Sequence, residues 1–328
     1  MTRVSKPLLL KPSGKDYLWG GRRLNDEFEK NIDMTPLAET WECSTHPDGP
    51  SYVASGEYEG RTLKEVIEDN PEYLGLRYAG WIDLPILIKF IDAKSDLSIQ
   101  VHPNDDYAKK YENGQLGKSE MWYVLDAKKD TRLIYGFKED TDASTIRNAV
   151  ETGTLLKYVQ QVPIKKDDLF FIEAGTVHAI GAGALVAEIQ ENSNLTYRLY
   201  DYDRIDKDGN KRTLHVDRAL ECANLKGSGE PHQPLRVLKY QRGVASELLC
   251  RCKYFEVYRM IVNTERHQQV KYRNDATSFK VLLCVNGCGT IDFGAEMIKF
   301  YKGDCIFVPA DCVELNIHGQ AQFLEVRG

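Results

Sequence analysis

The sequence lacks several features that would place it in common protein classes. It has no run of about 18 apolar residues, which excludes a membrane-spanning helix. Its only early apolar block, Leu8–Leu10, is too short for a signal peptide, so we expect a cytoplasmic protein with no membrane partner. The net charge is −6 and no basic stripe occurs, so nucleic acid is not an expected partner.

Closely paired cysteines are also scarce. Only Cys250 and Cys252 lie near each other, without a second pair at the spacing of a zinc ribbon. Several cysteines fall inside apolar segments, which is typical of buried thiols in a reducing compartment. We therefore expect free thiols and no disulfide framework. The eight cysteines are Cys43, Cys222, Cys250, Cys252, Cys284, Cys288, Cys305 and Cys312.

Short β-type segments broken by glycine, proline, asparagine and aspartate make up most of the chain. Examples are "DLPILIKFIDA", "SEMWYVLDA", "DDLFFIEAG" and "FKVLLCV". This pattern predicts a mainly β protein built from barrels or sandwiches. Few helices are expected. One should follow a capping box formed by Thr62 and Glu65, a second should lie within "DASTIRNAVETGTLLKYV", and a third should begin near Thr213.

An internal repeat indicates two related units. The segments starting at Lys165 and Tyr301 both carry an aspartate, an apolar strand, a turn and a returning strand. Ten residues separate Asp168 from His178 in the first copy and Asp304 from Glu314 in the second. We expect two cupin-type jelly-roll barrels: a catalytic metal-binding domain at 1–235 and a metal-free C-terminal domain at 236–328. The polar segment 226–234 is the expected linker.

A set of potential metal ligands falls in the first copy. Gln100 and His102 share one strand face about 6.6 Å apart, since a strand rises about 3.3 Å per residue. Glu120 begins an apolar strand, and His178 follows the turn at Gly175. Two imidazoles and a carboxylate suit zinc or non-haem iron. The neutral amide as a fourth ligand favours one zinc ion per chain.

The other histidines fall in loops, helix ends or the second unit, and we expect structural or surface roles for them. These are His46, His215, His232, His267 and His318.

The motifs "LSIQVHPND", "GKSEMWYVL", "EAGTVHAIGAG" and "EIQENSNLTYRLYDYDR" resemble those of the short bacterial type I mannose-6-phosphate isomerases. Weaker similarity, as in "DYLWGGRRL" and "ETWECSTHPDGPS", extends over nearly the whole chain. The resemblance implies a cupin fold, one zinc, and interconversion of mannose 6-phosphate and fructose 6-phosphate. It also implies a helical insert reduced to about 140–162. The zinc ligands that it implies are Gln100, His102, Glu120 and His178.

The resemblance further implies a catalytic arginine at Arg198 and substrate-site residues at Ser98, Lys118 and Glu188. A lysine of longer relatives would fall on Arg204, which keeps the charge but not the point-like geometry of an ammonium. We expect Arg204, like Ser98 and Lys118, to bind substrate.

The chemistry of aldose–ketose isomerisation fits these residues. A proton must move between C1 and C2, and the enediolate must be stabilised by an electrophile. Either Glu188 or Lys118 can serve as the base, and Arg198, Lys118 and Arg204 can supply fixed positive charge. Local sequence alone is also compatible with a solvated Lys118, or with Arg198 paired to Asp201 or Asp203.

Two other functions are compatible with part of this residue set. An iron-dependent dioxygenase would use His102, Glu120 and His178 but needs neither Gln100 nor a cationic cluster. A non-catalytic sugar-binding bicupin would not need the complete set of ligands and cations. We therefore predict an isomerase whose partner is a small sugar phosphate, and the sequence leaves its oligomeric state open.

Overall fold

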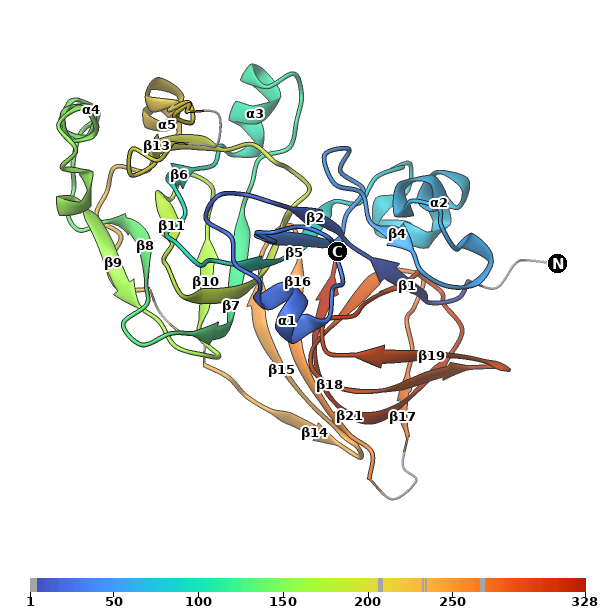
Figure 1. Cartoon of the computed structure of the whole chain (residues 1–328). Coiled ribbons are helices and arrows are strands. Elements are labelled where there is room, and N and C mark those ends of the chain that lie inside the picture. The colour runs from blue at the N-terminus through green and yellow to red at the C-terminus, as the bar shows by residue number, and fades with distance from the viewer. Residues whose placement is uncertain (1–4, 206–208, 232, 234, 266–268) are drawn as a thin grey trace.

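The computed structural model describes residues 5–205, 209–231, 233, 235–265 and 269–328. In Figure 1 the green and yellow part of the chain forms one unit, and the orange and red part forms a second beside it, with blue N-terminal segments in both. The prediction of a mainly β protein is confirmed. His232, His267 and position 234 of the expected linker lie outside the described residues. In the part of the chain that is described, no helix is long and apolar enough to cross a membrane.

Two antiparallel sheets build the first unit, and we call them the central sheet and the outer sheet. In spatial order the central sheet contains β10 (Leu169–Ile172), β7 (Glu120–Ala127), β12 (Ala184–Glu191), β5 (Ile86–Asp92), β3 (Glu39–Cys43) and β2 (Ser13–Lys15). The outer sheet contains β13 (Tyr197–Tyr200), β6 (Ile99–Val101), β11 (His178–Ile180), β8 (Arg132–Phe137) and β9 (Val159–Pro163).

Alternation along β7 shows why the central sheet is buried on both faces. Trp122 and Val124 point toward the outer sheet, where they join one apolar cluster. Met121 and Tyr123 point the other way and join a cluster shared with the second unit. Because side chains alternate along a strand, a sheet covered on both faces reads as a continuous apolar run. The central sheet is therefore the middle layer of the molecule.

The third sheet, which we call the C-terminal sheet, encloses its own core, including Phe300, Ile306 and Phe323. Its main path is β14 (Lys239–Gln241), β15 (Val244–Arg251), β16 (Glu256–Asn263), β21 (Leu315–Arg327), β18 (Lys280–Phe293), β20 (Cys305–Val308), β1 (Leu8–Lys11) and β4 (Tyr52–Val53). Off this path, β17 (Val270–Tyr272) pairs with β21, and β19 (Glu296–Tyr301) pairs with β18.

The first strand of the chain belongs to this C-terminal sheet. Leu8 and Leu10 of β1 lie opposite Phe307 and Cys305 of β20. The N-terminal strand thus crosses to the second unit before the chain returns to build the first (Figure 1). The division at 235/236 stays a prediction. All eight cysteines are free, as expected.

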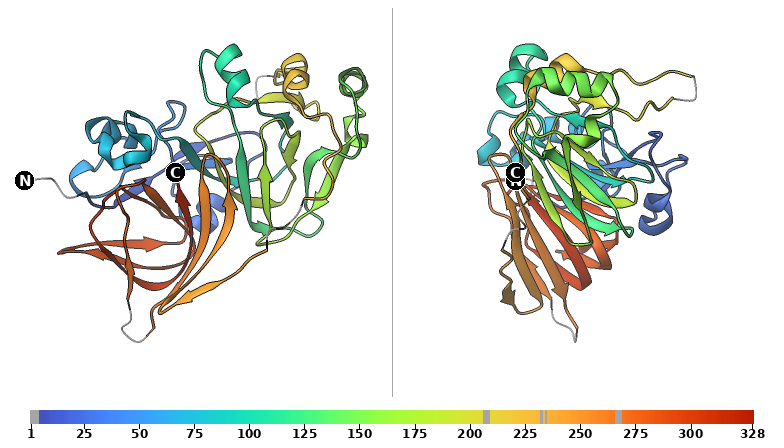
Figure 2. Two further views of the ribbon diagram at one scale, coloured as in Figure 1. Left: turned by 180° about the vertical axis from the view of Figure 1, so that it is seen from behind. Right: turned by 90° about the vertical axis from the view of Figure 1, so that its left-hand side faces the viewer.

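The helices are short and lie mostly over one end of the first unit, as both views in Figure 2 show for α3, α4 and α5. Their bounds are α1 (Arg23–Phe28), α2 (Leu63–Asp69), α3 (Asp105–Tyr111), α4 (Ala143–Glu151) and α5 (Val216–Cys222). Turns of 3₁₀ helix occur at Gly56–Tyr58, Pro71–Leu74, Leu76–Tyr78 and Leu155–Lys157.

Helix starts confirm most of the local predictions. The Thr62 side chain accepts from the Glu65 N–H, and the Glu65 carboxylate accepts from the Thr62 N–H, which completes the capping box before α2. The third helix, α5, starts later than expected, with His215 at its N-cap, so Thr213 as its cap is wrong. The reason is tertiary: the His215 N–H donates to the Arg198 carbonyl at 2.7 Å, which ties this segment to β13.

The two copies of the repeat share one local device. Oδ2 of Asp168 accepts from the Lys165 N–H at 2.9 Å, and Oδ2 of Asp304 accepts from the Tyr301 N–H at 2.7 Å. Each aspartate therefore closes the turn three residues before it. The copies differ at their returning strands: His178 is buried, whereas Glu314 pairs with Lys271 and Arg273 at the surface.

We expect the C-terminal unit to bind no metal. Glu314 is already neutralised by two cations at 3.2 and 2.5 Å, so it offers little charge to a divalent ion. Glu314→Ala should leave the metal content of the purified protein unchanged in elemental analysis, at about one ion per chain. A drop in metal content on this substitution would place a second ion in the C-terminal unit.

Candidate active site

One row of side chains crosses the outer sheet. Arg198 on β13 lies opposite Gln100 on β6, and Gln100 lies opposite His178 on β11. Directly opposed residues of neighbouring strands project from the same face. His102 follows Gln100 by two residues and shares that face. The pairing of three strands that are distant in the sequence thus brings these predicted residues together.

A second row crosses the facing side of the central sheet. Trp122 on β7 lies opposite Glu188 on β12, and Glu188 lies opposite Lys89 on β5. Glu120 stands two residues before Trp122, at the first position of β7. The two rows face each other across the interior of the first unit, where His102, Glu120 and His178 are each 1% exposed or less.

The two histidines and Glu120 converge on one point. His102 Nε2 lies 3.5 Å from one carboxylate oxygen of Glu120, and His178 Nε2 lies 3.5 Å from the other. All three ligand atoms lie within 4.8 Å of one another. A single ion between them can reach all three, since zinc binds nitrogen and oxygen ligands at about 2.0–2.2 Å.

Backbone carbonyls hold both imidazoles in the required orientation. Nδ1 of His102 lies 2.7 Å from the Leu195 carbonyl, and Nδ1 of His178 lies 2.8 Å from the Thr176 carbonyl. Each Nδ1–H donates to its carbonyl, which leaves the Nε2 lone pair directed at the cluster. Burial lowers the pKa of His178 to about 4 and that of His102 well below its usual range. Both rings are therefore neutral at neutral pH, which is the form in which an imidazole can bind a metal.

Glu120 carries the feature that best fits the binding of a cation. Its Oε1 atom is buried and accepts no hydrogen bond from any residue that the structure describes. An unsatisfied buried carboxylate oxygen is costly unless a cation or donor satisfies it. Burial, followed by the nearby Glu188 carboxylate, raises the pKa of Glu120 to about 7. A divalent ion bound at the cluster would satisfy Oε1, so these residues fit a metal.

Gln100 borders the same cluster. Its amide Nε2 lies 3.5 Å from His178 Nε2, and its Oε1 accepts from the Ser98 hydroxyl at 3.2 Å. A half-turn of the amide directs Oε1 at the cluster, which would complete a set of two imidazoles, one carboxylate and one amide oxygen.

Lys118 is buried rather than solvated, at 3% exposure. Its ammonium contacts the Glu120 carboxylate and lies 3.2 Å from His102 Nε2 and 3.6 Å from Glu188 Oε1. It thus stands between the ligand cluster and Glu188. The alternative that Lys118 is a solvated loop residue is therefore wrong.

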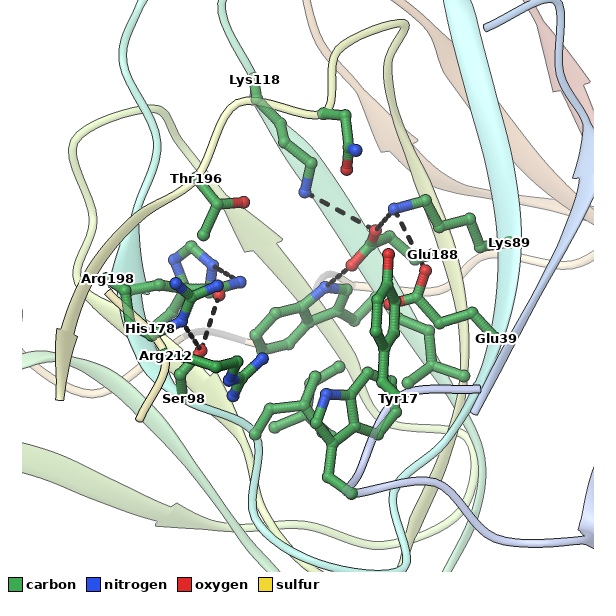
Figure 3. Close-up of a pocket in the computed structure, with 17 residues that line it drawn as sticks. Tyr17, Glu39, Lys89, Ser98, Lys118, His178, Glu188, Thr196, Arg198 and Arg212 are labelled. Carbon is green, nitrogen blue, oxygen red and sulfur yellow. Dashed lines mark hydrogen bonds and ion pairs between the residues drawn. The ribbon is translucent and has the colours of Figure 1, made fainter. Parts of the chain in front are cut away.

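A cavity of about 260 Å³ opens beside the cluster, and Figure 3 shows the polar side chains around it. Glu188 projects into it with Oε2 accepting from the Trp122 indole at 2.9 Å and Oε1 3.4 Å from Lys89. Burial raises the pKa of Glu188, but Lys118, Lys89 and the indole outweigh burial and hold it below the usual value. Glu188 is therefore ionised. The predicted residues that line the cavity are Ser98, Gln100, Lys118, His178, Glu188 and Arg198.

Arg198 lines the cavity and forms no ion pair with a carboxylate of any residue that the structure describes. Its Nε donates to the Ser98 hydroxyl at 3.2 Å, and its guanidinium donates to the Thr213 carbonyl at 3.0 Å. Asp201 instead pairs with Arg204 and Arg212, and Asp203 pairs with Lys211. The ion pair considered for Arg198 is thus replaced by contacts that leave it facing the cavity (Figure 3).

Arg204 is the predicted residue that the structure does not bring to the cavity. It binds Asp201 and the Asp96 carbonyl at the surface, and Arg212 lines the cavity in its place. Sequence reasoning missed both Arg212 and Lys89. A lysine inside the apolar run "PILIKFID" was a usable signal for Lys89, because a buried lysine needs partners. Arg212 carries no comparable local signal.

A mainly β protein with two units and a buried histidine–carboxylate cluster beside a cationic cavity is typical of a metal-dependent cupin enzyme. Comparison with known proteins agrees. Residues 8–131 match the model of the phosphomannose isomerase type I catalytic domain, and residues 246–327 match that of the mannose-6-phosphate isomerase cupin domain.

Full-length relatives extend this match. The chain is 36% identical to the mannose-6-phosphate isomerase ManA of Bacillus subtilis over 97% of this chain and 98% of that protein. It is 33% identical to the mannose-6-phosphate isomerase of Streptococcus mutans, with 98% of each covered. A crystal structure of the Bacillus subtilis mannose 6-phosphate isomerase superposes with a TM-score of 0.89 at 33% identity, covering 98% of this chain and 99% of that one. The chain therefore belongs to the type I mannose-6-phosphate isomerase family. The resemblance, the enzyme class and the isomerase function predicted from sequence are confirmed.

Proposed function

We propose that this cavity interconverts D-mannose 6-phosphate and D-fructose 6-phosphate with one zinc ion held by Gln100, His102, Glu120 and His178. The observation that carries the proposal is the buried convergence of both Nε2 atoms on the Glu120 carboxylate, whose Oε1 accepts no hydrogen bond from any residue that the structure describes. When bound, the metal acts as a Lewis acid that polarises the sugar carbonyl. Nitrogen and oxygen ligands with a neutral amide favour zinc over iron.

Lys118 and Glu188 are proposed to handle the proton that moves between C1 and C2. Their charged groups lie 3.6 Å apart in the cavity wall, so one can accept a proton while the other donates. Trp122 and Lys89 hold the Glu188 carboxylate in place, which limits the reorganisation needed during the reaction. Either residue can be the base.

Cations on the outer-sheet side are proposed to bind and stabilise negative charge. Arg198 and Arg212 both line the cavity, and burial and then Arg212 lower the pKa of Arg198. Two guanidinium groups near each other favour an anion between them, such as a phosphate or a developing enediolate. Ser98, bonded to both Arg198 and Gln100, would orient a substrate hydroxyl. Arg204 is not carried into this proposal.

The proposal extends to the domain organisation and the cellular compartment. Residues 1–235 would form the catalytic domain and 236–328 a metal-free domain. Eight free thiols support a reducing compartment, so we place the enzyme in the cytoplasm. Family membership favours neither an iron-dependent dioxygenase nor a non-catalytic sugar-binding protein.

A coupled assay with mannose 6-phosphate, before and after chelation, tests the proposal. Removing the metal should reduce turnover to near background, because the carbonyl loses its electrophile while the fold remains. Adding zinc back should restore the activity, and oxygen uptake should stay at the blank rate throughout. Turnover that persists in metal-free protein would contradict the metal-assisted reaction, and oxygen consumption would favour a dioxygenase.

A further inference from the structure

The segment that carries Lys118 is held by three successive backbone donors. The Gly117 N–H donates to Oδ1 of Asp105 at 3.1 Å, and the Lys118 N–H donates to the Pro103 carbonyl at 2.9 Å. The Ser119 N–H donates to Oε1 of Glu191 at 2.7 Å. Two of these three acceptors are carboxyl groups, and neither belongs to the proposed ligand set or to the cavity lining.

The first of these carboxylates is tied to the C-terminal unit. Oδ2 of Asp105 accepts from the Tyr254 hydroxyl at 2.8 Å and from the Lys253 ammonium at 3.1 Å. Both residues lie in the turn between β15 and β16, which is closed by a hydrogen bond from the Cys252 N–H to the Phe255 carbonyl at 3.0 Å. A short closed turn therefore presents the Tyr254 hydroxyl to the Asp105 carboxylate.

The two carboxyl groups also contact each other. Glu191 is 1% exposed, and burial, with the Asp105 charge next to it, raises its pKa to about 8. Asp105 keeps its charge because the bonds from Tyr254, Lys253 and Gly117 outweigh its partial burial and lower its pKa. Glu191 is thus protonated near neutral pH, and its proton can be shared with the neighbouring Asp105 carboxylate. The other titratable groups that face Glu191 are Lys253, Tyr254 and Cys252 of the β15–β16 turn.

The segment that carries Lys118 packs so closely against Asp105 that it must move when Asp105 moves. A Cβ on Gly117 would lie 2.5 Å from the Asn104 carbonyl carbon and the Asp105 nitrogen. The backbone at 117 therefore lies directly against the start of α3, so a displacement of α3 moves Lys118 with it. Lys118 itself is buried, with its ammonium held between the Glu120 and Glu188 carboxylates.

We propose that Tyr254 and Glu191 are positioning residues for Lys118, so that the C-terminal unit sets the geometry of the active site through Asp105. This inference rests on the proposed role of Lys118 in the isomerisation. The C-terminal unit would then contribute to catalysis by positioning Lys118, in addition to covering the central sheet.

A double-mutant cycle tests the inference. Tyr254→Phe removes one hydroxyl and keeps the ring packing, and it should lower kcat by about tenfold or more, because small misplacements of a reacting group are costly. In a Lys118→Met background the same substitution should have less than about a twofold effect, since coupled residues do not add. Tyr258→Phe, which removes a hydroxyl bonded to Glu256 in the same unit, is the matched control and should leave kcat unchanged.

Metal release to a chelator, measured in the same four proteins, gives a second readout if Lys118→Met is too slow to assay. Because the Lys118 ammonium touches the ligand cluster, Tyr254→Phe should alter the release rate only when Lys118 is present. Equal effects of Tyr254→Phe in both backgrounds, or no effect in either, would overturn the inference. Normal turnover of Lys118→Met would instead refute the proposed role of Lys118 and the inference with it.

Two substitutions at Glu191 distinguish the effect of its hydrogen bonds from the effect of its size. Glu191→Gln keeps an oxygen for the Ser119 N–H and an N–H for Asp105, so it should retain near-normal kcat. In Glu191→Ala, kcat should fall by about tenfold or more while KM changes little. Equal losses in both variants would show that Glu191 acts only in folding.

Discussion

Replacing His178 with alanine is expected to remove the bound metal and the isomerase activity together. The imidazole is one of the donors that converge on Glu120, and its Nε2 lies 3.5 Å from that carboxylate. Without it, the proposed ligand set is reduced to His102, Glu120 and the neutral Gln100. Elemental analysis of the purified variant should show a fall from about one ion per chain to nearly none. The coupled assay should show turnover near background even with added zinc at low concentration.

The fold of this variant must be checked separately, because His178 is fully buried against Trp122 at a ring distance of 5.4 Å. Thermal unfolding of the variant should remain cooperative. His102→Ala should also lose both the metal and the isomerase activity, because it removes the other imidazole of the cluster. His318→Ala is the matched control, since that imidazole lies 3.7 Å from Asp292 in the C-terminal unit. It should keep both metal and turnover. A folded His178→Ala protein that retains its metal would refute the ligand assignment.

Arg198→Ala is expected to lower turnover by roughly 100- to 1000-fold while the metal content stays unchanged. The guanidinium lines the cavity and is oriented by Ser98 and the Thr213 carbonyl. It would stabilise charge that grows on the sugar oxygens as the enediolate forms, which is binding of the transition state in preference to the substrate. Losing one such donor typically costs about 100- to 1000-fold in kcat. Elemental analysis and steady-state kinetics measure the two quantities.

The division of the loss between kcat and KM distinguishes two roles for Arg198. A fall in kcat with little change in KM indicates stabilisation of the enediolate, whereas a rise in KM alone indicates binding of the phosphate. Arg147→Ala removes an arginine that pairs with Asp217 away from the cavity and should change neither constant. Near-normal kcat and KM in Arg198→Ala would mean that the side chain serves only to tie β13 to the segment at Thr213.

Much of the ligand set could be predicted because it follows from local rules. Period-two alternation places Gln100 and His102 on one strand face, and the same rule separates Glu120 and Trp122 from Met121 and Tyr123. The Asp168 turn and the Thr62 capping box are likewise closed by atoms three residues apart. Such features depend on neighbours in the chain, so the sequence alone contains the information for them.

The substrate side of the cavity was harder to predict because its residues reach it through distant contacts. Arg204 and Arg212 both pair with Asp201, and the path of the chain around that carboxylate decides which of them faces the cavity. Both are arginines in a polar segment, so composition and spacing treat them alike. Lys89 was overlooked because its partners, Glu39 and Glu188, come from strands on either side of β5.

By itself the sequence determined the mainly β class, the repeat, the candidate ligands and the resemblance to the isomerase family. Only the tertiary structure decided that β1 joins the C-terminal sheet, that Arg212 lines the cavity, and that Tyr254 reaches Asp105. The physical reason is the range of the interactions. Alternation, capping and turn closure act over a few residues, whereas strand pairing and buried charge networks join segments up to hundreds of residues apart. Which partner each buried group finds is therefore set by the packing of the whole molecule.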